Sequence, residues 1–424
     1  MQIEESLLIA SIIIFIGFIG SLLLNRKNIP DSIFLILFGF LLGPLLHIVD
    51  PQQLSPLAPI VGALALIAIM FESSMGIDLN ELLLTAKQAL ILSLAGFAAS
   101  VFITYVFLYY IVGFAPDNPL YSILIGVIIG GGSGAVIASI APRISMPNSL
   151  QITVSLESVL TDVYVIIFSL TILSILAGKG ENIPVSMIAG SIVAKFSTSV
   201  IMGFIAGLIL ADLIYRFKRE QHLYIMVFAY LILLYVGAEF LMGSGAITVL
   251  TAGIVVANIQ YLPRFLRGSG EDKVDIVKYQ LFSMESAHTE LTLLIRIFFF
   301  VEVGLVLNLT NIDLILKSLI LSLLLLAIRY PIAYGVTRSL GFRHKNGIAA
   351  LVTTFFYARG LAAAVMAIWA AQETITINGV TKPLLPPTVS EYVIGIASAV
   401  VLFTNIILTL GVASIKNKVR ELLF

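Results

Sequence analysis

Apolar runs longer than 18 residues recur from one end of the chain to the other, and this pattern limits what the chain can fold into. An uncharged run of that length is typical of a helix that crosses a lipid bilayer. Only 11% of the 424 residues are charged, whereas soluble domains have about 25%. The chain contains no cysteine, which excludes a disulfide framework and thiolate metal sites. We therefore expect an all-α polytopic membrane protein.

Thirteen transmembrane helices are predicted, separated by Pro, Gly, Asn and charged clusters. They lie at residues 6–24, 32–49, 57–76, 87–113, 119–142, 150–177, 183–214, 222–240, 243–260, 288–307, 313–337, 347–371 and 391–414. The one long polar connection, residues 261–287, is predicted to be a cytoplasmic amphipathic linker between two halves of the protein.

The placement of Lys and Arg in the connections predicts the orientation of the chain. One set of alternate loops carries Arg26, Lys27, Lys87, Arg143, Arg216, Lys218, Arg219, Arg264, Arg267, Lys273, Lys278, Arg338, Arg343, Lys345, Lys416, Lys418 and Arg420. The other set carries only Lys179, Lys317 and Lys382. Because basic loops favour the cytoplasm, we expect a multi-pass protein of the cell membrane with its N-terminus outside and its C-terminus inside.

The stretch "SLESVLTDVYVIIFSL" (155–170) places two carboxylates in a predicted span. An ionised group at mid-membrane costs several kcal/mol and rarely persists without a partner or a task. Asp162 lies near the middle of its span, and Ser158 precedes it by one helical turn on the same face, with Thr161 adjacent. One carboxylate and two hydroxyls are hard oxygen ligands for an alkali cation or a proton. We predict that Asp162, Ser158 and Thr161 form an ion-binding site.

Glu157 is five residues from Asp162 and points to a different side of the helix. Arg329 lies at a matching depth in the eleventh span, so a structural ion pair between Glu157 and Arg329 is predicted. Arg296 has a similar depth and is the rival partner. The alternative to an ion-binding role is a purely structural one, in which residues of neighbouring helices pair with the acid. We favour the structural role for Glu157. We favour ion binding for Asp162, because its own helix supplies no cation.

Two spans carry interruptions of small residues. The fifth contains "GVIIGGGSGAVIASI", with Ser133 after three glycines, and the twelfth contains Arg359–Gly360 at its centre. Seven spans separate them, so they cross the membrane in opposite directions, as do spans 4–6 and 11–13. Interrupted helices in inverted halves indicate the binding site of a secondary transporter. Ser133 is a candidate ligand of the transported ion. Arg359 is expected to neutralise the carbonyl ends of helices at this crossing. The alternative explanation of the glycine run is a face for close helix packing.

Several motifs now indicate a family. They are "IPDSIFLILFGFLLGP" (29–44), "FESSMGIDLNEL" (71–82), "ESVLTD" (157–162), "LIRIFFFVEVGLVLNL" (294–309), "AIRYPIAYGV" (327–336) and "YARGLAAAV" (357–365). In order, spacing and topology they resemble the monovalent cation/proton antiporters, most closely the archaeal NhaP-type sodium/proton antiporters. The resemblance covers nearly the whole chain.

The resemblance implies a homodimer with two domains. Residues 1–86 and 183–307 would form the dimerisation domain, and residues 87–182 and 308–424 the mobile ion-transport core. It also implies that Asp162 binds cation and proton alternately and that Glu157 pairs with Arg329. Two departures bear on selectivity: Thr161 replaces the usual Asn, and Gly132–Ser133–Gly134 replaces the usual Thr-Asp-Pro. Because that acid is missing, K⁺ is a candidate for the transported cation as well as Na⁺.

We expect an electroneutral antiporter that exchanges one Na⁺, Li⁺ or K⁺ for one H⁺, with a role in pH homeostasis. The alternatives are a potassium/proton antiporter and a sodium-coupled symporter of a small organic anion, in which Arg359 would offer a charge. A channel is disfavoured because no filter-like carbonyl repeat is present. We expect no enzymatic activity, no cofactor and no nucleic-acid partner. The expected partners are the transported ions and membrane lipid. Structural roles are expected for Glu302 and Lys195.

Overall fold

The backbone is helical almost throughout, because a helix satisfies each N–H and C=O group within one segment, as an apolar run in lipid requires. The computed structural model describes residues 3–26, 29–49, 58–75, 77–133, 146–179, 185–262, 272–305, 311–340, 346–377 and 380–419. Within these ranges the prediction of a helical protein is confirmed, and each predicted span contains at least one helix. The number of membrane crossings stays a prediction.

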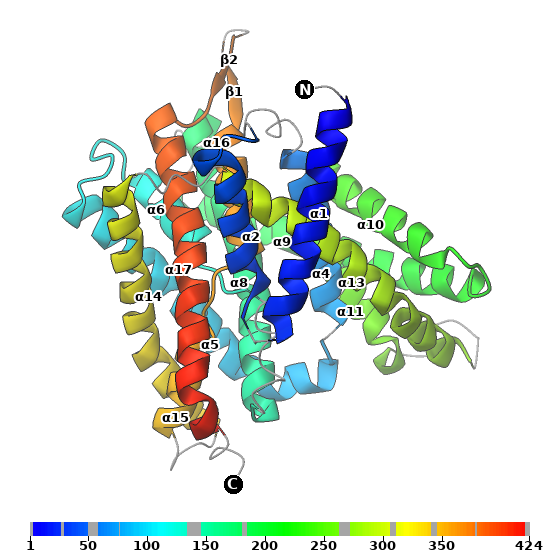
Figure 1. Cartoon of the computed structure of the whole chain (residues 1–424). Helices are drawn as coiled ribbons and strands as arrows, with labels where there is room; N and C mark the ends of the chain where they lie inside the picture. The colour runs from blue at the N-terminus through cyan, green and yellow to red at the C-terminus, as the bar shows by residue number, and fades with distance from the viewer. Residues whose placement is uncertain are drawn as a thin grey trace. The chain divides into compact units, whose positions relative to one another are not determined.

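Figure 1 shows the arrangement of the helices. The α-helices are α1 (Ile3–Arg26), α2 (Asp31–Phe40), α4 (Ala58–Met75), α5 (Leu79–Tyr105), α6 (Pro119–Ile128), α8 (Asn148–Ser174), α9 (Val185–Arg216), α10 (Leu223–Phe240), α11 (Gly245–Ala257), α13 (Lys273–Leu305), α14 (Ile312–Ser339), α15 (Asn346–Phe355), α16 (Leu361–Gln372) and α17 (Pro387–Val419). Wider π-helical turns extend three of them: η1 (Leu41–Leu45), η2 (Val106–Ile111) and η4 (Ile175–Lys179). A short 3₁₀ turn, η5 (Ile259–Tyr261), follows α11.

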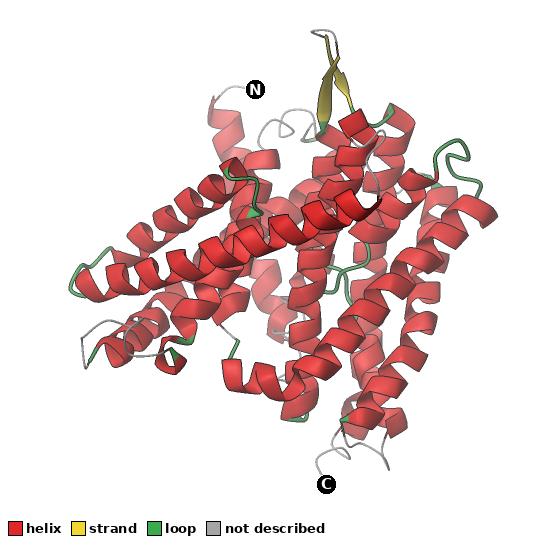
Figure 2. Ribbon diagram, turned by 180° about the vertical axis from the view of Figure 1, so that it is seen from behind, coloured by secondary structure: helices red, strands yellow, loops and turns green. Residues whose placement is uncertain are grey.

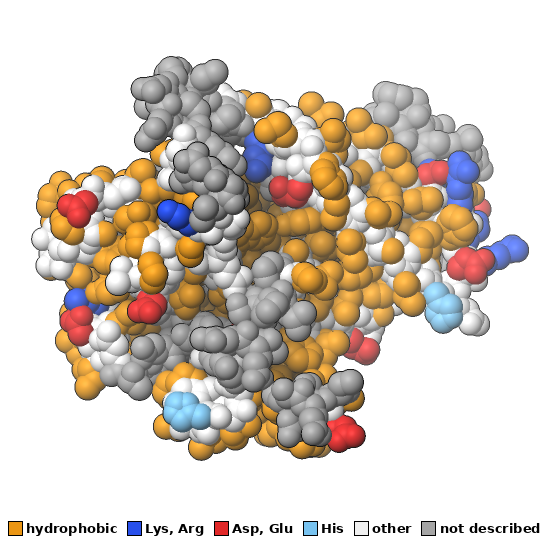
Figure 3. Space-filling model, turned by 90° about the horizontal axis from the view of Figure 1, so that it is seen from above, with side chains coloured by type: hydrophobic (Ala, Val, Ile, Leu, Met, Phe, Trp, Pro, Cys, Tyr) orange, Lys and Arg blue, Asp and Glu red, His pale blue; other side chains and the backbone are white. Residues whose placement is uncertain are grey.

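The outer surface suits lipid rather than water. Among the described helices, six are long and apolar enough to cross a bilayer: Leu7–Leu24, Thr85–Ile111, Ser149–Gly178, Val193–Arg216, Leu223–Phe240 and Pro387–Ile415. Large side chains such as Phe15 (67% exposed) and Leu233 (71% exposed) point outward. Hydrophobic side chains cover most of the described surface on the face in Figure 3, and charged ones are few. Apolar surface on this scale marks a membrane or protein contact.

The all-α prediction needs one correction. A β-hairpin follows α16, formed by the antiparallel strands β1 (Thr374–Ile377) and β2 (Val380–Pro383), and Figure 2 shows it in yellow. Strand β1 reads Thr-Ile-Thr-Ile, and such β-branched residues favour an extended backbone. The hairpin lies between the twelfth and thirteenth predicted spans.

The predicted linker at 261–287 also differs from the structure. Residues 263–271 lie outside the described residues, but α13 starts at Lys273 and continues without a break into the tenth predicted span. Val277, Leu281, Met284 and His288 are buried at helical spacing, while Phe282 is 76% exposed. This amphipathic face explains why the segment is helical rather than irregular.

The chain divides into two compact units. Unit 1 comprises residues 1–59, 85–181 and 297–424, and unit 2 comprises residues 60–84 and 182–296. Their boundaries lie near those of the predicted domains, with one difference: residues 1–59 and 297–305 cluster with the larger unit. The functional roles given to the two domains remain predictions.

Close backbone packing explains that difference within unit 1. A Cβ on Gly39 of α2 would lie 2.1 Å from the Val301 carbonyl oxygen, and one on Gly304 would lie 2.1 Å from the Ile36 carbonyl oxygen. These glycines let α2 approach the end of α13 at backbone distance. Elsewhere in unit 1, α14 packs with α15 and α17, and α16 packs with α8 and α17.

In unit 2 the main contact is between α9 and α11. Gly203 and Gly207 lie one turn apart on α9, and a Cβ on Gly203 would lie 2.6 Å from the Thr248 carbonyl oxygen. This is the small-xxx-small pattern by which membrane helices associate closely. His288 joins three helices of the unit, since its ring nitrogens lie 2.9 Å from Tyr224 Oη and 2.9 Å from the Ala68 carbonyl oxygen.

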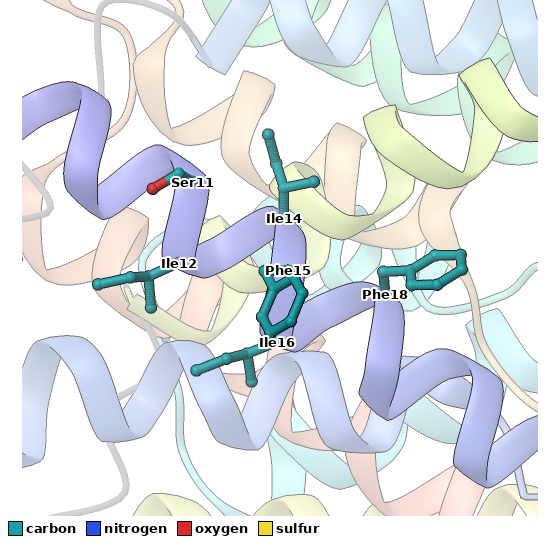
Figure 4. A pocket seen from close by; sticks show the side chains of 6 residues that line it. All are labelled: Ser11, Ile12, Ile14, Phe15, Ile16 and Phe18. Carbon is teal, nitrogen blue, oxygen red and sulfur yellow. The ribbon is translucent and has the colours of Figure 1, made fainter.

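One apolar hollow lies on α1, with a volume of about 750 Å³, and Figure 4 shows its lining. The side chains are Ser11, Ile12, Ile14, Phe15, Ile16 and Phe18. The Ser11 hydroxyl donates to the Leu8 carbonyl oxygen at 2.8 Å. None of these side chains is ionisable, so the hollow is not suited to bind a cation or a proton.

Candidate functional site

Two non-helical segments meet inside unit 1. Helix α6 ends at Ile128; a turn at residues 129–130 follows, in which Ile129 N–H still donates to the Ile125 carbonyl oxygen, and residues 131–133 are not helical. Helices α15 and α16 are separated by the non-helical residues 356–360. Ser133 N–H donates to the Ala358 carbonyl oxygen at 2.8 Å, which joins the two segments directly. Residues 134–145, which include Gly134 of the predicted interruption, lie outside the described residues.

The closeness of this crossing depends on a glycine. A Cβ on Gly360 would lie 2.2 Å from Ser133 Oγ and 2.5 Å from Ser133 Cβ. A Cβ atom cannot approach another heavy atom this closely without displacing it. Gly360 is therefore required for the contact between the two segments.

Arg359 occupies the place where helix α6 ends. Its Nη1 donates to the carbonyl oxygens of Gly130 at 2.8 Å and Gly131 at 2.7 Å, and its Nη2 donates to Ser100 Oγ at 3.3 Å. The guanidinium lies 3.5 Å above the Tyr357 ring. Carbonyl groups at a helix C-terminus carry partial negative charge, which a cation compensates. The geometry matches the role expected for Arg359.

Glu157 and Arg329 form a buried, bidentate ion pair. Arg329 Nη1 lies 2.5 Å from Glu157 Oε1 and Nη2 lies 2.6 Å from Oε2. The two residues are 3% and 1% exposed. Nε of the same arginine donates to the Thr353 carbonyl oxygen at 3.1 Å, and the guanidinium also lies 4.0 Å from the Tyr357 ring. Both Glu157 oxygens are thus engaged by Arg329, and the rival Arg296 belongs to unit 2.

Asp162 has no such partner. It is 5% exposed, and among the described residues no hydrogen bond or ion pair reaches its carboxylate. One turn earlier on α8, Ser158 is 1% exposed and its Oγ has no hydrogen-bond partner in the described structure. The two side chains share a helix face, as predicted from their spacing. They leave carboxylate and hydroxyl oxygens available inside the protein.

Thr161 is used differently from Ser158. Its Oγ1 accepts from Gly132 N–H at 2.9 Å and donates to the Ser158 carbonyl oxygen at 3.0 Å. The predicted ligand therefore ties the non-helical segment 129–133 to α8, with one lone pair remaining for a cation. Ser133 is 5% exposed and lies in the same segment. The arrangement brings Ser133, Ser158, Thr161 and Asp162 into one region of unit 1.

Sequence reasoning missed four polar residues around the crossing. Tyr357 lies between the two arginines, and its hydroxyl hydrogen-bonds to Ser100 Oγ. Thr404 and Asn405 of α17 bind the backbone of Arg359. The adjacent Thr-Asn pair inside the apolar run "VVLFTNIILTL" was a usable signal, because such residues rarely occur there without a hydrogen-bonding role.

In the described part of the site, Asp162 is the one carboxylate without a hydrogen-bond or ion-pair partner. Among the described residues there is no group of three or more His, Cys, Asp or Glu side chains arranged to hold a metal ion. Multidentate carboxylate cages of the kind that bind divalent cations need more acids than this. One acid with hydroxyl neighbours is suited to a proton or a monovalent cation.

Comparisons with solved structures give the fold. The sodium proton antiporter MjNhaP1 from Methanocaldococcus jannaschii at pH 8 superimposes with a TM-score of 0.75 and 19% identity over 98% of this chain and 97% of that one. A second structure of MjNhaP1, from electron microscopy, gives a TM-score of 0.77 and covers 100% of this chain and 99% of that one. This chain therefore has the fold of those proteins.

Comparisons of sequence give the family. A K(+)/H(+) antiporter NhaP2 of Shewanella sp. strain ANA-3 is 24% identical over 61% of this chain, and that of Shewanella baltica strain OS223 is 23% identical over the same share. Each match spans only 44% of the relative's length. The model of the transmembrane sodium/hydrogen exchanger family matches residues 10–418. The chain therefore belongs to the transmembrane sodium/hydrogen exchanger family of cation/proton antiporters.

Proposed function

We propose that this protein exchanges one monovalent cation for one proton, with Asp162 as the residue that binds each in turn. The observation that carries the proposal is the contrast between two acids of one helix: Asp162 is buried and no partner among the described residues reaches its carboxylate, whereas Glu157 is neutralised by Arg329. A bare carboxylate in a dry interior is costly. Binding a proton or a partly dehydrated cation removes that cost.

Competition between the two ligands gives obligatory exchange. Desolvation favours the protonated carboxyl, while a bound cation favours the ionised form. The loaded carrier is neutral at this position with either ligand. The empty carrier keeps a buried charge, so its conformational change between the inward-open and outward-open states is slow. Alternating access would follow from movement of the antiparallel helix triplets against the rest of the protein.

The same charges support a 1:1 stoichiometry. Glu157 has both oxygens bound to Arg329, and the described crossing residues 129–133 carry no acid. One titrating group then accounts for one proton out and one cation in. A second free carboxylate would have permitted an extra proton and net movement of charge.

We leave the cation as Na⁺, Li⁺ or K⁺. The solved relatives are described as sodium proton antiporters and the Shewanella relatives as K(+)/H(+) antiporters. Potassium/proton exchange is the second candidate, because the crossing lacks the second acid and so offers fewer direct ligands. The symporter alternative is weakened, since Arg359 already donates to two carbonyls and a hydroxyl.

The proposal places the protein in the cell membrane as a homodimer. It has thirteen spans, two interrupted helices at the crossing, an outside N-terminus and a cytoplasmic C-terminus. Residues 87–182 and 308–424 act as the moving core, and residues 1–86 and 183–307 form the dimer interface. The support for this topology is the uneven distribution of Lys and Arg among the loops. No cofactor takes part besides the transported ions.

The test is proton release from reconstituted liposomes after addition of Na⁺, Li⁺, K⁺ or Rb⁺, followed with a pH-sensitive dye. The wild-type protein is expected to respond to at least one of these ions. Asp162→Asn keeps the size of the side chain but removes the charge, and it is expected to abolish the response to every cation.

Asp313→Asn is the matched control. This acid pairs with Lys317 near the start of α14 and its side chain is 66% exposed. The control should exchange cations like the wild type. Exchange that persists in Asp162→Asn would remove Asp162 from the mechanism.

A further inference from the structure

A polar pair in α17 holds the backbone of the second crossing segment. Arg359 N–H donates to Thr404 Oγ1 at 3.0 Å, and Asn405 Nδ2 donates to the Arg359 carbonyl oxygen at 2.9 Å. Thr404 is 6% exposed and Asn405 is 1% exposed. Two adjacent residues thus bind both polar backbone groups of Arg359.

These contacts replace hydrogen bonds that the broken helix has lost. Residues 356–360 lie between α15 and α16; Phe356 N–H still donates to the Val352 carbonyl oxygen, but Arg359 makes no helical backbone hydrogen bond in the described structure, and all five residues are buried. An unpaired N–H or C=O group there would cost as much as a lost hydrogen bond, with no water to replace it. The side chains of α17 therefore stabilise the interruption itself.

A third residue orients the pair. Ser32 of α2 donates its hydroxyl to Asn405 Oδ1 at 3.2 Å. Asn405 Nδ2 also donates to the Val401 carbonyl oxygen at 2.7 Å, so its amide has defined partners on both sides. Helix α2 lies alongside α17, as Figure 1 shows. Ser32 is 1% exposed and touches neither Asp162 nor the crossing through any hydrogen bond in the described structure.

We propose that Thr404 and Asn405, oriented by Ser32, are positioning residues of the cation site. The inference rests on the proposed function. Fixing the Arg359 backbone fixes its guanidinium, which holds the Gly130 and Gly131 carbonyls. The neighbouring Gly132 N–H is bound to Thr161 beside Asp162. A displaced Arg359 would move the segment that faces the cation.

The experiment compares two replacements of Thr404 in full-length reconstituted protein. Thr404→Val keeps the shape but loses the hydroxyl that accepts from Arg359, and Thr404→Ser keeps the hydroxyl. At a fixed pH, Thr404→Val is expected to raise the KM for the best cation roughly tenfold, the usual effect of losing an outer-shell partner. Thr404→Ser should return most of that affinity. A general loss of stability would instead lower the maximal rate and leave the KM unchanged.

Thr409→Val is the matched control on the same helix. In the described structure the Thr409 hydroxyl donates only to the Asn405 carbonyl oxygen, within α17, at 2.9 Å. Its KM should equal that of the wild type. A KM for Thr404→Val equal to that of the control, or equal losses in Thr404→Val and Thr404→Ser, would overturn the inference.

Ser32→Ala decides the question if Thr404→Val is not recovered folded. It removes the hydroxyl that orients Asn405, and it is expected to raise the KM in the same direction by a smaller factor. An unchanged KM in Ser32→Ala would then overturn the inference. Failure of the wild type to exchange any of the four cations would instead overturn the proposed function, so the two failures are distinguishable.

Discussion

Glu157 and Asp162 lie on one helix and are both buried, but their surroundings give them opposite chemistry. Arg329 supplies Glu157 with two charge-assisted hydrogen bonds, and Gly96 of α5 packs beside the pair, where a Cβ would lie 3.5 Å from Arg329 Nη1. Asp162 has the Ser158 hydroxyl one helical turn away, and no cationic side chain of the described part of the chain pairs with it. At the scale of single residues, we therefore expect a structural role for Glu157 and an ion-binding role for Asp162.

Arg329→Met should destabilise the protein strongly. The change leaves Glu157 buried without its counter-charge, and losing one member of a buried pair costs about 3–5 kcal/mol. The measurement is thermal unfolding of the detergent-solubilised protein. Combining the change with Glu157→Gln removes the uncompensated charge and should restore part of the lost stability.

Arg216→Met is the control for this comparison. Arg216 pairs with Asp212 at 2.5 Å, but its side chain is 71% exposed, and exposed pairs contribute little. Its unfolding temperature should stay close to that of the wild type. Equal unfolding temperatures for Arg329→Met and Arg216→Met would contradict a stabilising role for the buried pair.

At the scale of elements, two non-helical segments contact one another. Segment 129–133 ends the ladder of α6, segment 356–360 separates α15 from α16, and the Ser133–Ala358 hydrogen bond joins them. Arg359 from one segment occupies the carbonyls of the other. Each segment supplies hydrogen-bond partners to the other, so we expect the two conformations to depend on one another.

Gly360→Ala should separate the segments and abolish exchange. The new Cβ would lie 2.2 Å from Ser133 Oγ, a distance at which the backbone has to move. Liposome transport is the measurement. The double variant Gly360→Ala/Ser133→Gly removes the clashing side chain and should recover part of the activity.

Gly335→Ala is a matched change in an open position. A Cβ on Gly335 of α14 meets nothing within 4 Å, so activity should be unaffected, and helix propensity favours alanine by about 1 kcal/mol. Normal transport by Gly360→Ala would show that the crossing tolerates a side chain and that its tight contact is dispensable.

At the scale of the whole molecule, we propose that one carboxylate couples two ion flows. The proposed competition predicts that the apparent KM for the cation rises as the pH falls, because protons occupy more of the carriers. Once the protonated form dominates, the rise should approach about tenfold per pH unit. Initial rates at several pH values and cation concentrations measure this. A maximal rate that falls with pH at constant KM would indicate that the proton acts elsewhere.

Electroneutrality is a separate prediction for the whole cycle. One cation in and one proton out move no net charge, so a solid-supported membrane should record no steady current during saturating exchange. The same preparation must show exchange by the dye assay. A sustained current would demand a second titrating acid besides Asp162.

Much of this protein was determined by the sequence itself. Long apolar runs require helices wherever lipid is the solvent, and depth along antiparallel spans was enough to predict the Glu157–Arg329 pair. The spacing of Ser158 and Asp162 placed them on one helix face because the α-helical period is fixed. Small residues at mid-span predicted interruptions near Gly132 and Gly360; residues 356–360 are not helical, whereas residues 134–145 lie outside the described structure, so two interrupted spans stay a prediction.

Only the tertiary structure decided which groups meet across helices. No local pattern shows that Thr161 binds Gly132, that Asn405 binds Arg359 or that Ser32 binds Asn405, since these contacts join distant segments. It also placed residues 1–59 with the larger unit, through glycine contacts between α2 and the end of α13. Helix periodicity determines which face a residue occupies. The partner of that face depends on how the helices pack, and the packing is a property of the whole chain.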